Sequence, residues 1–387
     1  MKNILIGITS SISAYKIFEL IRQYKKEGHN VKVVLTPNAK HFVSEIVLQT
    51  LSENIVYCEQ FEKRDNVEHI SLVDWADCFV LAPASANTIS ACALGLANNL
   101  LTSVFCAFLG SKKPILIAPA MNCDMWNNPI IQENIQKLKS LGVEFVDPES
   151  GFLACGTVGV GRLAKIEDIF EKSLRLVYQN KKNNDKKILV TLGGTKEKID
   201  NVRYITNSSS GNMGKALCKW AYRFGFDVCA ISTLEYSAIY KIINVQSANE
   251  MLEELKKQDF DCLIMASAVA DFRVQNQSDT KISKEDIENE FNLKLIKNPD
   301  VVSEISKNKK ESQTIVGFCL ADKDLIETAK RKLENKNLDY IVANDVKIAL
   351  NTTSNAVTII DKNGKIIDIE LDVKDEIAKK ILEVVCD

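Results

Sequence analysis

Short apolar segments alternate with amphipathic stretches of helical length along the first half of the chain. Continuous apolar runs of this size are typical of strands that are buried on both faces of a parallel sheet, and the amphipathic stretches supply the crossover helices. The predicted strands are Asn3–Ile8, Val31–Thr36, Cys78–Ala82 and Pro114–Ala118, and two of the predicted helices are Ala14–Glu27 and Ile130–Leu141. The pattern predicts an open α/β sheet.

The same pattern restarts after residue 187 and predicts a second sheet. Its expected strands are Ile188–Leu192, Asp227–Ser232, Cys262–Ala266, Thr314–Phe318 and Tyr340–Ala343. Near the end, Val357–Ile360 and Ile366–Leu371 flank an Asn-Gly dipeptide, which predicts a β-hairpin. The stretch Gln179–Lys187 contains no apolar residue, as expected of a solvated linker. The fold class is therefore α/β, with two open, mainly parallel-sheet domains at residues 1–180 and 188–387, joined by a linker at residues 181–187.

Composition and charge exclude several classes of partner. The chain has 387 residues, 49 basic and 51 acidic side chains, and a formal charge of -2. Such a balance creates no long-range field that would gather nucleic acid or an anionic membrane. Its apolar runs fall short of the roughly 20 residues that span a bilayer. The segment Met1–Ile8 lacks the features of a signal peptide, so the expected location is the cytoplasm.

Cysteine and histidine usage gives no indication of a metal centre. The 11 cysteines are scattered through apolar segments without a CxxC pair, and the 3 histidines do not have the spacing of metal ligands. Most of the cysteines are expected to be small buried hydrophobic residues.

Loops that follow strands are the expected ligand sites in sheets of this kind. The loop Gly7–Ala14 is rich in hydroxyl groups and leads directly into a helix. Its serines either help the helix N-terminus to bind a phosphate, or Ser11 or Ser13 simply caps the helix. A second small, hydroxyl-rich loop, Ala82–Thr88, follows the third strand. Two such loops at one sheet edge favour a phosphorylated cofactor.

Three further segments make the first half more specific. They are Glu68–Leu72 with Trp75–Asp77, Ala118–Asn122 with Met125-Trp126, and Ser150-Gly151 followed by Ala154–Gly156. Together with the two loops, these segments resemble the flavin-dependent phosphopantothenoylcysteine decarboxylases over residues 1 to about 180.

The second half resembles the phosphopantothenate–cysteine ligases. The motifs that carry this resemblance are Gly193–Thr195 with Glu197 and Ile199-Asp200, Val202–Asn207 with Ser209–Gly211 and Met213-Gly214, Ala268–Phe272, Lys281-Ile282, Lys297–Asp300, Lys336–Asp339 and Ala343–Asp345. The two halves together look like the bifunctional coenzyme A biosynthesis proteins of bacteria, with a flavodoxin-like flavoprotein domain followed by a Rossmann-like ligase domain.

The resemblance implies an FMN-dependent decarboxylation of phosphopantothenoylcysteine to 4'-phosphopantetheine. FMN would oxidise the cysteine thiol, because the resulting thioaldehyde accepts the electrons that decarboxylation releases. By motif position, His69 is the acid/base group, Asn122 holds the substrate carboxylate and Cys155 protonates the enethiolate. The FMN-binding residues implied are Ser10, Ser11, Ser85 and Asn87.

The resemblance also implies that CTP activates 4'-phosphopantothenate. CMP would be transferred to the carboxylate with release of pyrophosphate, and the amine of L-cysteine would attack the acyl-cytidylate. Lysines and Mg²⁺ are expected where phosphates meet. Asn207 and Lys281 are the implied catalytic residues, and Arg203 would bind phosphate. The other implied nucleotide-binding residues are Met265, Ala266, Ser267, Asp271, Asn298, Pro299, Asp300, Val301, Phe318, Lys332 and Lys336, together with Lys281.

Two features remain open at the level of sequence. Cys319–Asp322 departs from the small residues and glutamate usual in the ligase family, which leaves the preference for CTP over another triphosphate undecided. Relatives form trimeric decarboxylase contacts and dimeric ligase contacts, so the resemblance implies a homo-oligomer.

Two other classes of protein fit the sequence less well. A non-catalytic flavodoxin-like regulatory subunit would not need His69, Asn122 and Cys155 or a ligase half. A nicotinamide-dependent oxidoreductase would need a dinucleotide fingerprint, and Gly156-x-x-Gly159-x-Gly161 matches that motif neither in order nor in context.

Overall fold

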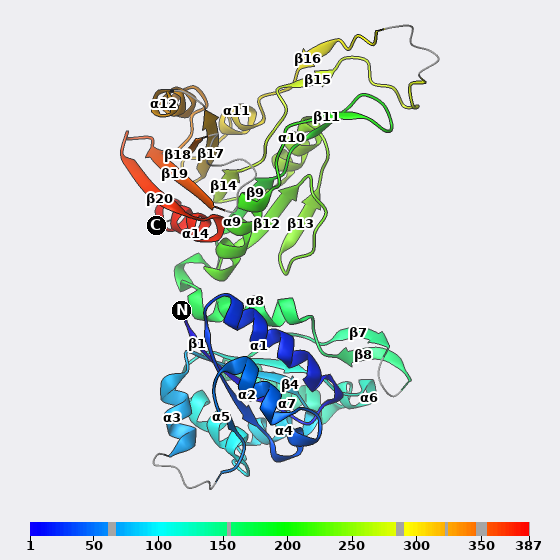
Figure 1. Cartoon of the computed structure of the whole chain (residues 1–387), viewed down its shortest axis with the longest axis vertical. Helices are drawn as coiled ribbons and strands as arrows, with labels where there is room; N and C mark the ends of the chain where they lie inside the picture. Colours follow the sequence, from blue (N-terminus) through cyan, green and yellow to red (C-terminus); the bar gives the residue numbers. More distant parts are fainter. Residues whose placement is uncertain (61–66, 153–155, 284–289, 322–323, 346–353, 387) are drawn as a thin grey trace. The chain divides into compact units, whose positions relative to one another are not determined.

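The structure is a computed structural model that describes residues 1–60, 67–152, 156–283, 290–321, 324–345 and 354–386 (Figure 1). The chain divides into two compact units, Met1–Tyr178 and Gln179–Asp387. Each unit is an α/β structure built on its own sheet.

The sheet of the first unit has six parallel strands in the order β3-β2-β1-β4-β5-β6. All four strands predicted in this half are present. Without the two-residue edge strand β3, the order is that of flavodoxin, and the direction of winding reverses between β1 and β4. The strands are β1 (Asn3–Ile8), β2 (Asn30–Leu35), β3 (Val56–Tyr57), β4 (Cys78–Ala84), β5 (Ile115–Pro119) and β6 (Glu144–Phe145).

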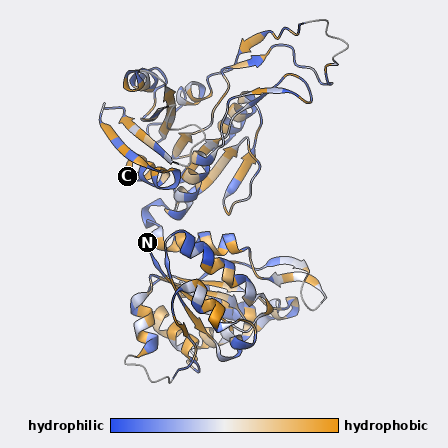
Figure 2. Ribbon diagram, viewed as in Figure 1, coloured by the Kyte–Doolittle hydropathy of each residue, from blue (hydrophilic) through white to orange (hydrophobic). Residues whose placement is uncertain are grey.

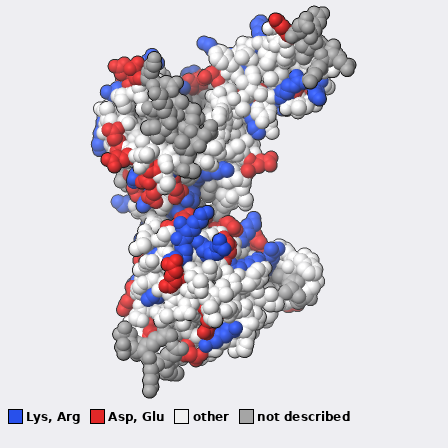
Figure 3. All heavy atoms as spheres, viewed as in Figure 1, with Lys and Arg blue, Asp and Glu red and all other residues white. Residues whose placement is uncertain are grey.

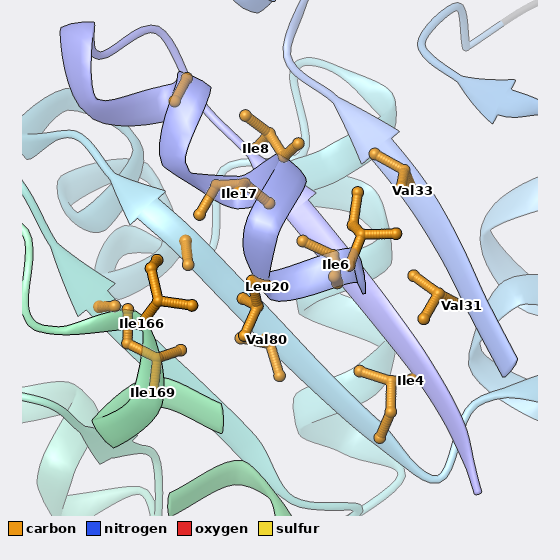
Figure 4. Packing of buried hydrophobic residues seen from close by; sticks show 14 of the residues in the cluster. Ile4, Ile6, Ile8, Ile17, Leu20, Val31, Val33, Val80, Ile166 and Ile169 are labelled. Atoms are coloured by element: carbon orange, nitrogen blue, oxygen red, sulfur yellow. The ribbon is translucent and has the colours of Figure 1, made fainter. Parts of the chain in front are cut away.

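Helices cover both faces of this sheet because its strands are apolar on both sides (Figure 2). Ile17 and Leu20 of α1 and Ile169 of α8 pack on one face against side chains such as Ile6 and Val80 (Figure 4). Helices α3, α4, α5 and α7 contribute to the second buried cluster. The helices are α1 (Ile17–Lys26), α2 (Glu45–Ser52), α3 (Glu68–Trp75), α4 (Ala86–Leu94), α5 (Leu100–Gly110), α6 (Cys123–Trp126), α7 (Pro129–Ser140) and α8 (Ile166–Tyr178), with 3-10 helices η1 (Ile12–Lys16) and η2 (Pro37–His41).

A short antiparallel hairpin, β7 (Glu149–Phe152) and β8 (Val158–Arg162), lies outside the main sheet of the first unit. Strand β8 contacts α6, which follows β5. The hairpin thereby returns the chain to the carboxyl edge of the sheet, where sites form in doubly wound folds.

The sheet of the second unit has eight strands in the order β13-β12-β9-β14-β17-β18-β19-β20. The first six are parallel, as predicted, in the classical Rossmann order with its reversal between β9 and β14. The predicted hairpin is confirmed as β19 and β20, with β19 antiparallel to β18 and β20 antiparallel to β19. The strands are β9 (Lys187–Leu192), β12 (Asp227–Ser232), β13 (Lys241–Asn244), β14 (Cys262–Met265), β17 (Thr314–Ala321), β18 (Tyr340–Asp345), β19 (Ser354–Asp361) and β20 (Ile366–Val373).

Helices also pack against the second sheet. One buried cluster joins α10, α11 and α12 to residues such as Leu189 and Leu263. Helices α9 and α14 contact each other, with α9 against β9 and α14 against β19. The helices are α9 (Asn212–Arg223), α10 (Ala248–Lys257), α11 (Val301–Ser306), α12 (Leu325–Asn335) and α14 (Lys374–Val385).

Two short ribbons extend from this sheet and form what we call the arm, the described residues within 196–206 and 272–297 (Figure 1). Strand β10 (Lys196–Lys198) pairs with β11 (Tyr204–Thr206), and β15 (Phe272–Val274) pairs with β16 (Leu295–Lys297). The backbone N–H of Ser278 donates to the carbonyl of Ile199 over 3.0 Å, which ties the two ribbons together.

The segment predicted as a linker is ordered against the second unit. Residues Lys181–Asn183 form a 3-10 helix (η3), and the buried Asn183 donates through Nδ2 to the carbonyl of Phe224 over 3.1 Å. Residues 181–187 thus belong to the same compact unit as the second sheet.

Surface charge agrees with the neutral composition. Basic and acidic side chains are interspersed on the face shown in Figure 3. Among the described residues, no helix is both long and apolar enough to span a bilayer.

A lysine cap at the end of α3 provides a test of the first unit. Lys113 Nζ donates to the carbonyls of Val73 (2.7 Å), Asp74 (3.1 Å) and Ala76 (2.9 Å), where a cation is favoured by the helix dipole. We expect Lys113→Ala to lower the free energy of unfolding of this unit by about 1–3 kcal/mol, because three carbonyls lose a charged donor. Calorimetry of the full chain measures the change. Lys137→Ala, at an exposed helical lysine, is the control, and equal effects of the two substitutions would contradict the cap.

Candidate active sites

The loops after β1 and β4 meet at the point where the first sheet reverses its winding. Thr9 Oγ1 donates to the carbonyl of Pro83 over 2.7 Å and accepts from the backbone N–H of Ser85 over 2.9 Å. This buried threonine holds the two loops side by side. The four predicted FMN residues, Ser10, Ser11, Ser85 and Asn87, therefore lie on two adjoining loops.

The serines of these loops make different hydrogen bonds within the protein. Ser85 caps α4, since its Oγ accepts from the backbone N–H of Thr88 over 3.4 Å. Ser11 precedes η1 without a capping bond, and its Oγ lies 3.0 Å from Ser13 Oγ. Ser11 therefore does not make the capping bond that the sequence left open for it, and Ser85 caps a different helix, α4.

Thr36 is a polar residue at the same edge that the sequence did not single out. It follows β2, is only 7% exposed, and has an Oγ1 that finds no hydrogen-bond partner among the described residues. A buried hydroxyl without a partner destabilises a fold, which makes Thr36 a candidate for contact with a ligand at this edge. The sequence feature that could have identified Thr36 is its hydroxyl group directly after the apolar residues of a strand.

Asn122 follows β5 and is held beneath the β7–β8 hairpin. It begins α6, and its Oδ1 accepts from the backbone N–H of Asp124 over 2.7 Å. The backbone N–H of Met121 donates to the carbonyl of Gly161 over 2.9 Å. A Cβ at Gly161 would lie 2.2 Å from the carbonyl oxygen of Met121, so glycine is required by this close approach of two backbones.

The other two predicted residues of the first unit are placed differently. His69 is half-buried in the first turn of α3, which packs on α5. Within the described part of the chain, no hydrogen bond or ion pair links His69 to Asn122 or to the serine loops. Cys155 lies outside the described residues.

The second unit contains a cleft of about 970 Å³ at the carboxyl edge of its sheet. It lies at the winding reversal, between the loops that follow β9 and β14. The cleft brings together most of the residues predicted for nucleotide binding and ligation. These are Asn207, Met265, Ala266, Ser267, Asp271, Asn298, Pro299, Asp300, Val301, Phe318, Lys332 and Lys336.

One side of the cleft is the N-terminus of α9. Its N-cap, Gly211, has a φ of +68°, and a Cβ there would lie 2.5 Å from a methyl group of Leu234. The first turn carries no acidic residue, so the backbone N–H groups and the helix dipole favour an anion. Asn207 Nδ2 donates to the carbonyl of Val269 over 3.1 Å, which joins the loop before α9 to the loop after β14.

Another side of the cleft carries an ion pair. Lys336 Nζ lies 2.8 Å from Asp300 Oδ2, and Asp300 also accepts from the backbone N–H of Ser303. Burial alone would raise the pKa of Asp300, but the Lys336 ammonium and the Ser303 N–H outweigh it and hold the pKa below its ordinary value. Lys332 lies one helical turn before Lys336 and lines the same cleft.

Arg203 and Lys281 lie on the arm and do not line this cleft. Arg203 Nη2 donates to the carbonyl of Ile282 over 2.9 Å, and its Nε lies 3.7 Å from Asp200 Oδ2. Burial would raise the pKa of Asp200, but three backbone N–H groups and the Arg203 guanidinium lower it. Lys281 is exposed beside this cluster.

The departure from the ligase pattern also falls in the cleft. Cys319 and Leu320 both line it, the first buried and the second exposed. Asp322 lies outside the described residues. The cleft additionally contains Asn344, Asn355 and Lys374, which were not among the predicted site residues.

The close approach of Gly161 to Met121 allows a test of how β8 packs against the loop after β5. We expect Gly161→Ala to displace β8 from Met121, because the added Cβ would overlap a carbonyl oxygen. Trypsin should then cleave after Arg162 faster than in the unmodified protein, as followed by mass spectrometry. Gly110→Ala is the matched control, since a Cβ at the end of α5 meets nothing within 4 Å. Unchanged cleavage after Arg162 would refute the constraint.

Comparisons with known proteins cover both units. Residues 1–178 match the family model described as flavoprotein, and residues 183–387 match that of the DNA/pantothenate metabolism flavoprotein C-terminal domain. The coenzyme A biosynthesis bifunctional protein CoaBC of Borreliella burgdorferi is 39% identical over 390 residues, which cover 99% of this chain and 98% of the relative. The protein of the same name from Haemophilus influenzae is 40% identical over 375 residues, covering 94% and 92%.

Solved structures resemble the units separately. The C-terminal domain of a coenzyme A biosynthesis bifunctional protein CoaBC has 32% identity and a TM-score of 0.46, over 53% of this chain and 96% of that chain. The FMN-binding protein AtHal3 has 34% identity and a TM-score of 0.40, over 44% and 94%. From the sequence matches along nearly its whole length, the chain belongs to the family of bifunctional coenzyme A biosynthesis proteins, enzymes that join a flavoprotein decarboxylase domain to a ligase domain.

Proposed function

We propose that this enzyme uses CTP to join L-cysteine to 4'-phosphopantothenate through an acyl-cytidylate, and then uses FMN to decarboxylate the product to 4'-phosphopantetheine. The observation that carries the proposal is the cleft of the second unit, which gathers the residues that ligase resemblance assigns to the nucleotide. The hydroxyl-rich sheet edge of the first unit supports the second reaction.

FMN fits the donors at the edge of the first sheet. Ser10, Ser11 and Ser85 offer hydroxyls, the start of η1 offers backbone N–H groups, and Thr36 has an unsatisfied Oγ1. Groups of this kind suit a phosphate and the polar atoms around it. Asn87 is exposed on the first turn of α4, next to the loop of Ser85, and would contact the cofactor from there.

The chain's own groups would bind the substrate and move its protons. The flavin supplies an acceptor, and later a donor, for the electrons of the substrate's cysteine moiety. Asn122 holds the departing carboxylate with its amide, and His69 takes the proton lost as the thiol is oxidised. Cys155 returns a proton to the enethiolate, a role suited to a thiol whose ordinary pKa of about 8.5 keeps it protonated at neutral pH.

In the ligase half, the carboxylate oxygen must become part of a leaving group before an amine can attack it. The N-terminus of α9, Lys332 and Lys336 neutralise phosphate charge as the carboxylate attacks the α-phosphate and pyrophosphate leaves. An entering phosphate competes with Asp300 for the Lys336 ammonium. Mg²⁺ is proposed to accompany the CTP phosphates.

We also propose that the enzyme is a homo-oligomer, with dimeric contacts through the arm and trimeric contacts through the flavoprotein unit. Arg203 and Lys281 lie on the arm and do not line the cleft, although the ligase resemblance assigns both of them to the reaction. The arm also exposes apolar side chains, among them Val202 (59%) and Phe272 (47%). A second copy would cover these side chains and receive the arm's cations at its own cleft.

The proposed location is the cytoplasm. Each of the 10 cysteines that the structure describes carries a free thiol. Free thiols fit a reducing compartment.

The function is tested with purified protein, 4'-phosphopantothenate, cysteine and each nucleotide triphosphate in turn. We expect pyrophosphate, carbon dioxide and 4'-phosphopantetheine with CTP, and at most weak turnover with other triphosphates. His69→Asn should retain FMN and pyrophosphate release but lose carbon dioxide release by a factor of at least about 100, the usual contribution of a general acid or base. No pyrophosphate with any triphosphate would refute the ligase assignment, and full decarboxylation by His69→Asn would refute the role of His69.

Completion of the cleft by a second copy is tested by mixing two inactive variants. Arg203→Ala alters the arm and Asn207→Ala alters the cleft. If the arm serves the other copy, an equimolar mixture regains about a quarter of the ligase activity, because about half of randomly paired dimers are mixed and each keeps one intact site. If the arm serves its own cleft, the mixture stays inactive. A mixture of Asn207→Ala with Lys332→Ala, both in the cleft, is the matched control and should stay inactive in either case.

A further inference from the structure

Cys262 and Cys386 belong to neither of the two sites described above. Cys262 is the first residue of β14, and Cys386 directly follows the last residue of α14. Both carry free thiols, and Cys262 is buried whereas Cys386 is half-buried. The two residues are far apart in the sequence, and the topology of the second unit brings them together.

Helix α14 runs from the carboxyl edge of the sheet back to its amino edge. Strand β19 is antiparallel to β18 and β20 is antiparallel to β19, so β20 ends at the same edge as β18. Helix α14 begins directly after β20, and its first residue lines the ligase cleft at that edge. The helix packs on β19, β20 and α9, and its 12 residues span about 18 Å. Its last turn therefore lies at the amino edge, where β14 begins.

Cys262 points to the face of the sheet that α14 covers. Leu263 and Met265, its neighbours on β14, belong to the buried cluster that contains α10, α11 and α12. Successive side chains of a strand point to opposite faces, so Cys262 shares neither their face nor their cluster. Helices α9 and α14 lie together, joined by a hydrogen bond from Trp220 Nε1 to Asp375 Oδ2 over 3.1 Å. Their described buried residues are also outside that cluster.

The two thiols are in direct contact. The side chains of Cys262 and Cys386 are hydrogen-bonded to each other, and this bond, together with burial, raises the pKa of the Cys262 thiol. Cys262 is therefore protonated at neutral pH, and a buried, protonated thiol is inert toward reagents in solution. Cys386 is the more exposed of the two, so a reagent reaches its sulfur first.

We propose that Cys262 and Cys386 form a thiol–disulfide modification site, at which a low-molecular-weight disulfide links the end of α14 to the start of β14. The Cys386 thiolate attacks one sulfur of the small disulfide, which gives a mixed disulfide and releases one small thiolate. Cys262 then gives up its proton and attacks the Cys386 sulfur, and the second small thiolate leaves. Two electrons pass from the protein thiols to the small disulfide, whose two thiolates take up the protons.

The link fastens the last helix of the unit to the middle of its sheet, since β14 lies between β9 and β17. In a reducing compartment the pair stays in the dithiol form, and a disulfide that forms there is a transient one. The linked residues lie at the edge opposite the ligase cleft, so the bond holds α14 without placing a group in that cleft.

The first test treats the folded full-length protein with cystine, blocks the remaining thiols by alkylation and digests the protein with trypsin without reductant. We expect mass spectrometry to find peptides 258–273 and 381–387 linked, because each contains a single cysteine, Cys262 or Cys386. Excess cysteine should break the link. Cys386→Ser should abolish it, whereas Cys106→Ser, which removes a half-buried thiol of α5, is the matched control and should leave its yield unchanged.

Hydrogen exchange then tests whether the link fastens the helix. Backbone amides in the last turn of α14 should exchange about tenfold or more slowly after oxidation, and the original rate should return with excess cysteine. No linked peptides from the folded protein would overturn the proposal, as would a mixed disulfide at Cys386 that Cys262 does not resolve. Linkage that is equally fast in urea-unfolded protein, or linkage without slower exchange, would also contradict it, because the folded arrangement of the two thiols would then have no effect.

Discussion

The structure depends on one geometric constraint: neighbouring parallel strands end at the same edge of a sheet, and their crossover helices must cover both faces. Each unit therefore gathers its post-strand loops at one edge, although the loops are far apart in the sequence. In the first unit, Thr9 joins the loops after β1 and β4 through two hydrogen bonds. In the second, Asn207 joins the loop before α9 to the loop after β14. Each junction leaves backbone donors unpaired at the carboxyl edge of its sheet, where ligands bind in folds of this kind.

A nearly neutral chain that handles several anions must bind each one with local groups. The first unit offers hydroxyls and backbone N–H groups, which are neutral donors. The second unit offers lysines, and it pairs Lys336 with Asp300 in the cleft. That pairing keeps the net charge of the cleft low, and it makes phosphate binding an exchange of one anionic partner for another. Under the proposed function, the two units would therefore bind phosphorylated ligands by different electrostatic means.

The sequence predicted the sheets well and the sites unevenly, for physical reasons. The predicted strands of both sheets were found because burial on both faces forces continuous apolar runs, as in Asn3–Ile8. The arm was missed because three-residue strands such as Lys196–Lys198 bury too little to leave a pattern. Motif resemblance assigned most of the residues that line the cleft, some in loops after strands, such as Asp271, and others on helices, such as Lys332. It gave no role to Thr36, because the burial of that hydroxyl depends on packing against residues distant in the sequence.

Arg203 and Lys281 both lie on the arm, and hydrogen bonds within the arm hold the Arg203 side chain in place. Asp200 anchors the tip of the arm by accepting three backbone N–H groups and pairing with Arg203, so the guanidinium is held in place before any ligand binds. Such anchoring reduces the conformational entropy that a cation on an extended ribbon would lose on meeting a phosphate. The anchored cation nevertheless lies outside the cleft of its own unit. Under the proposed function, this ordered cation would act in the reaction only if the arm, with exposed apolar side chains such as Val202, met the cleft of a second copy, and assembly and ligation would then be coupled.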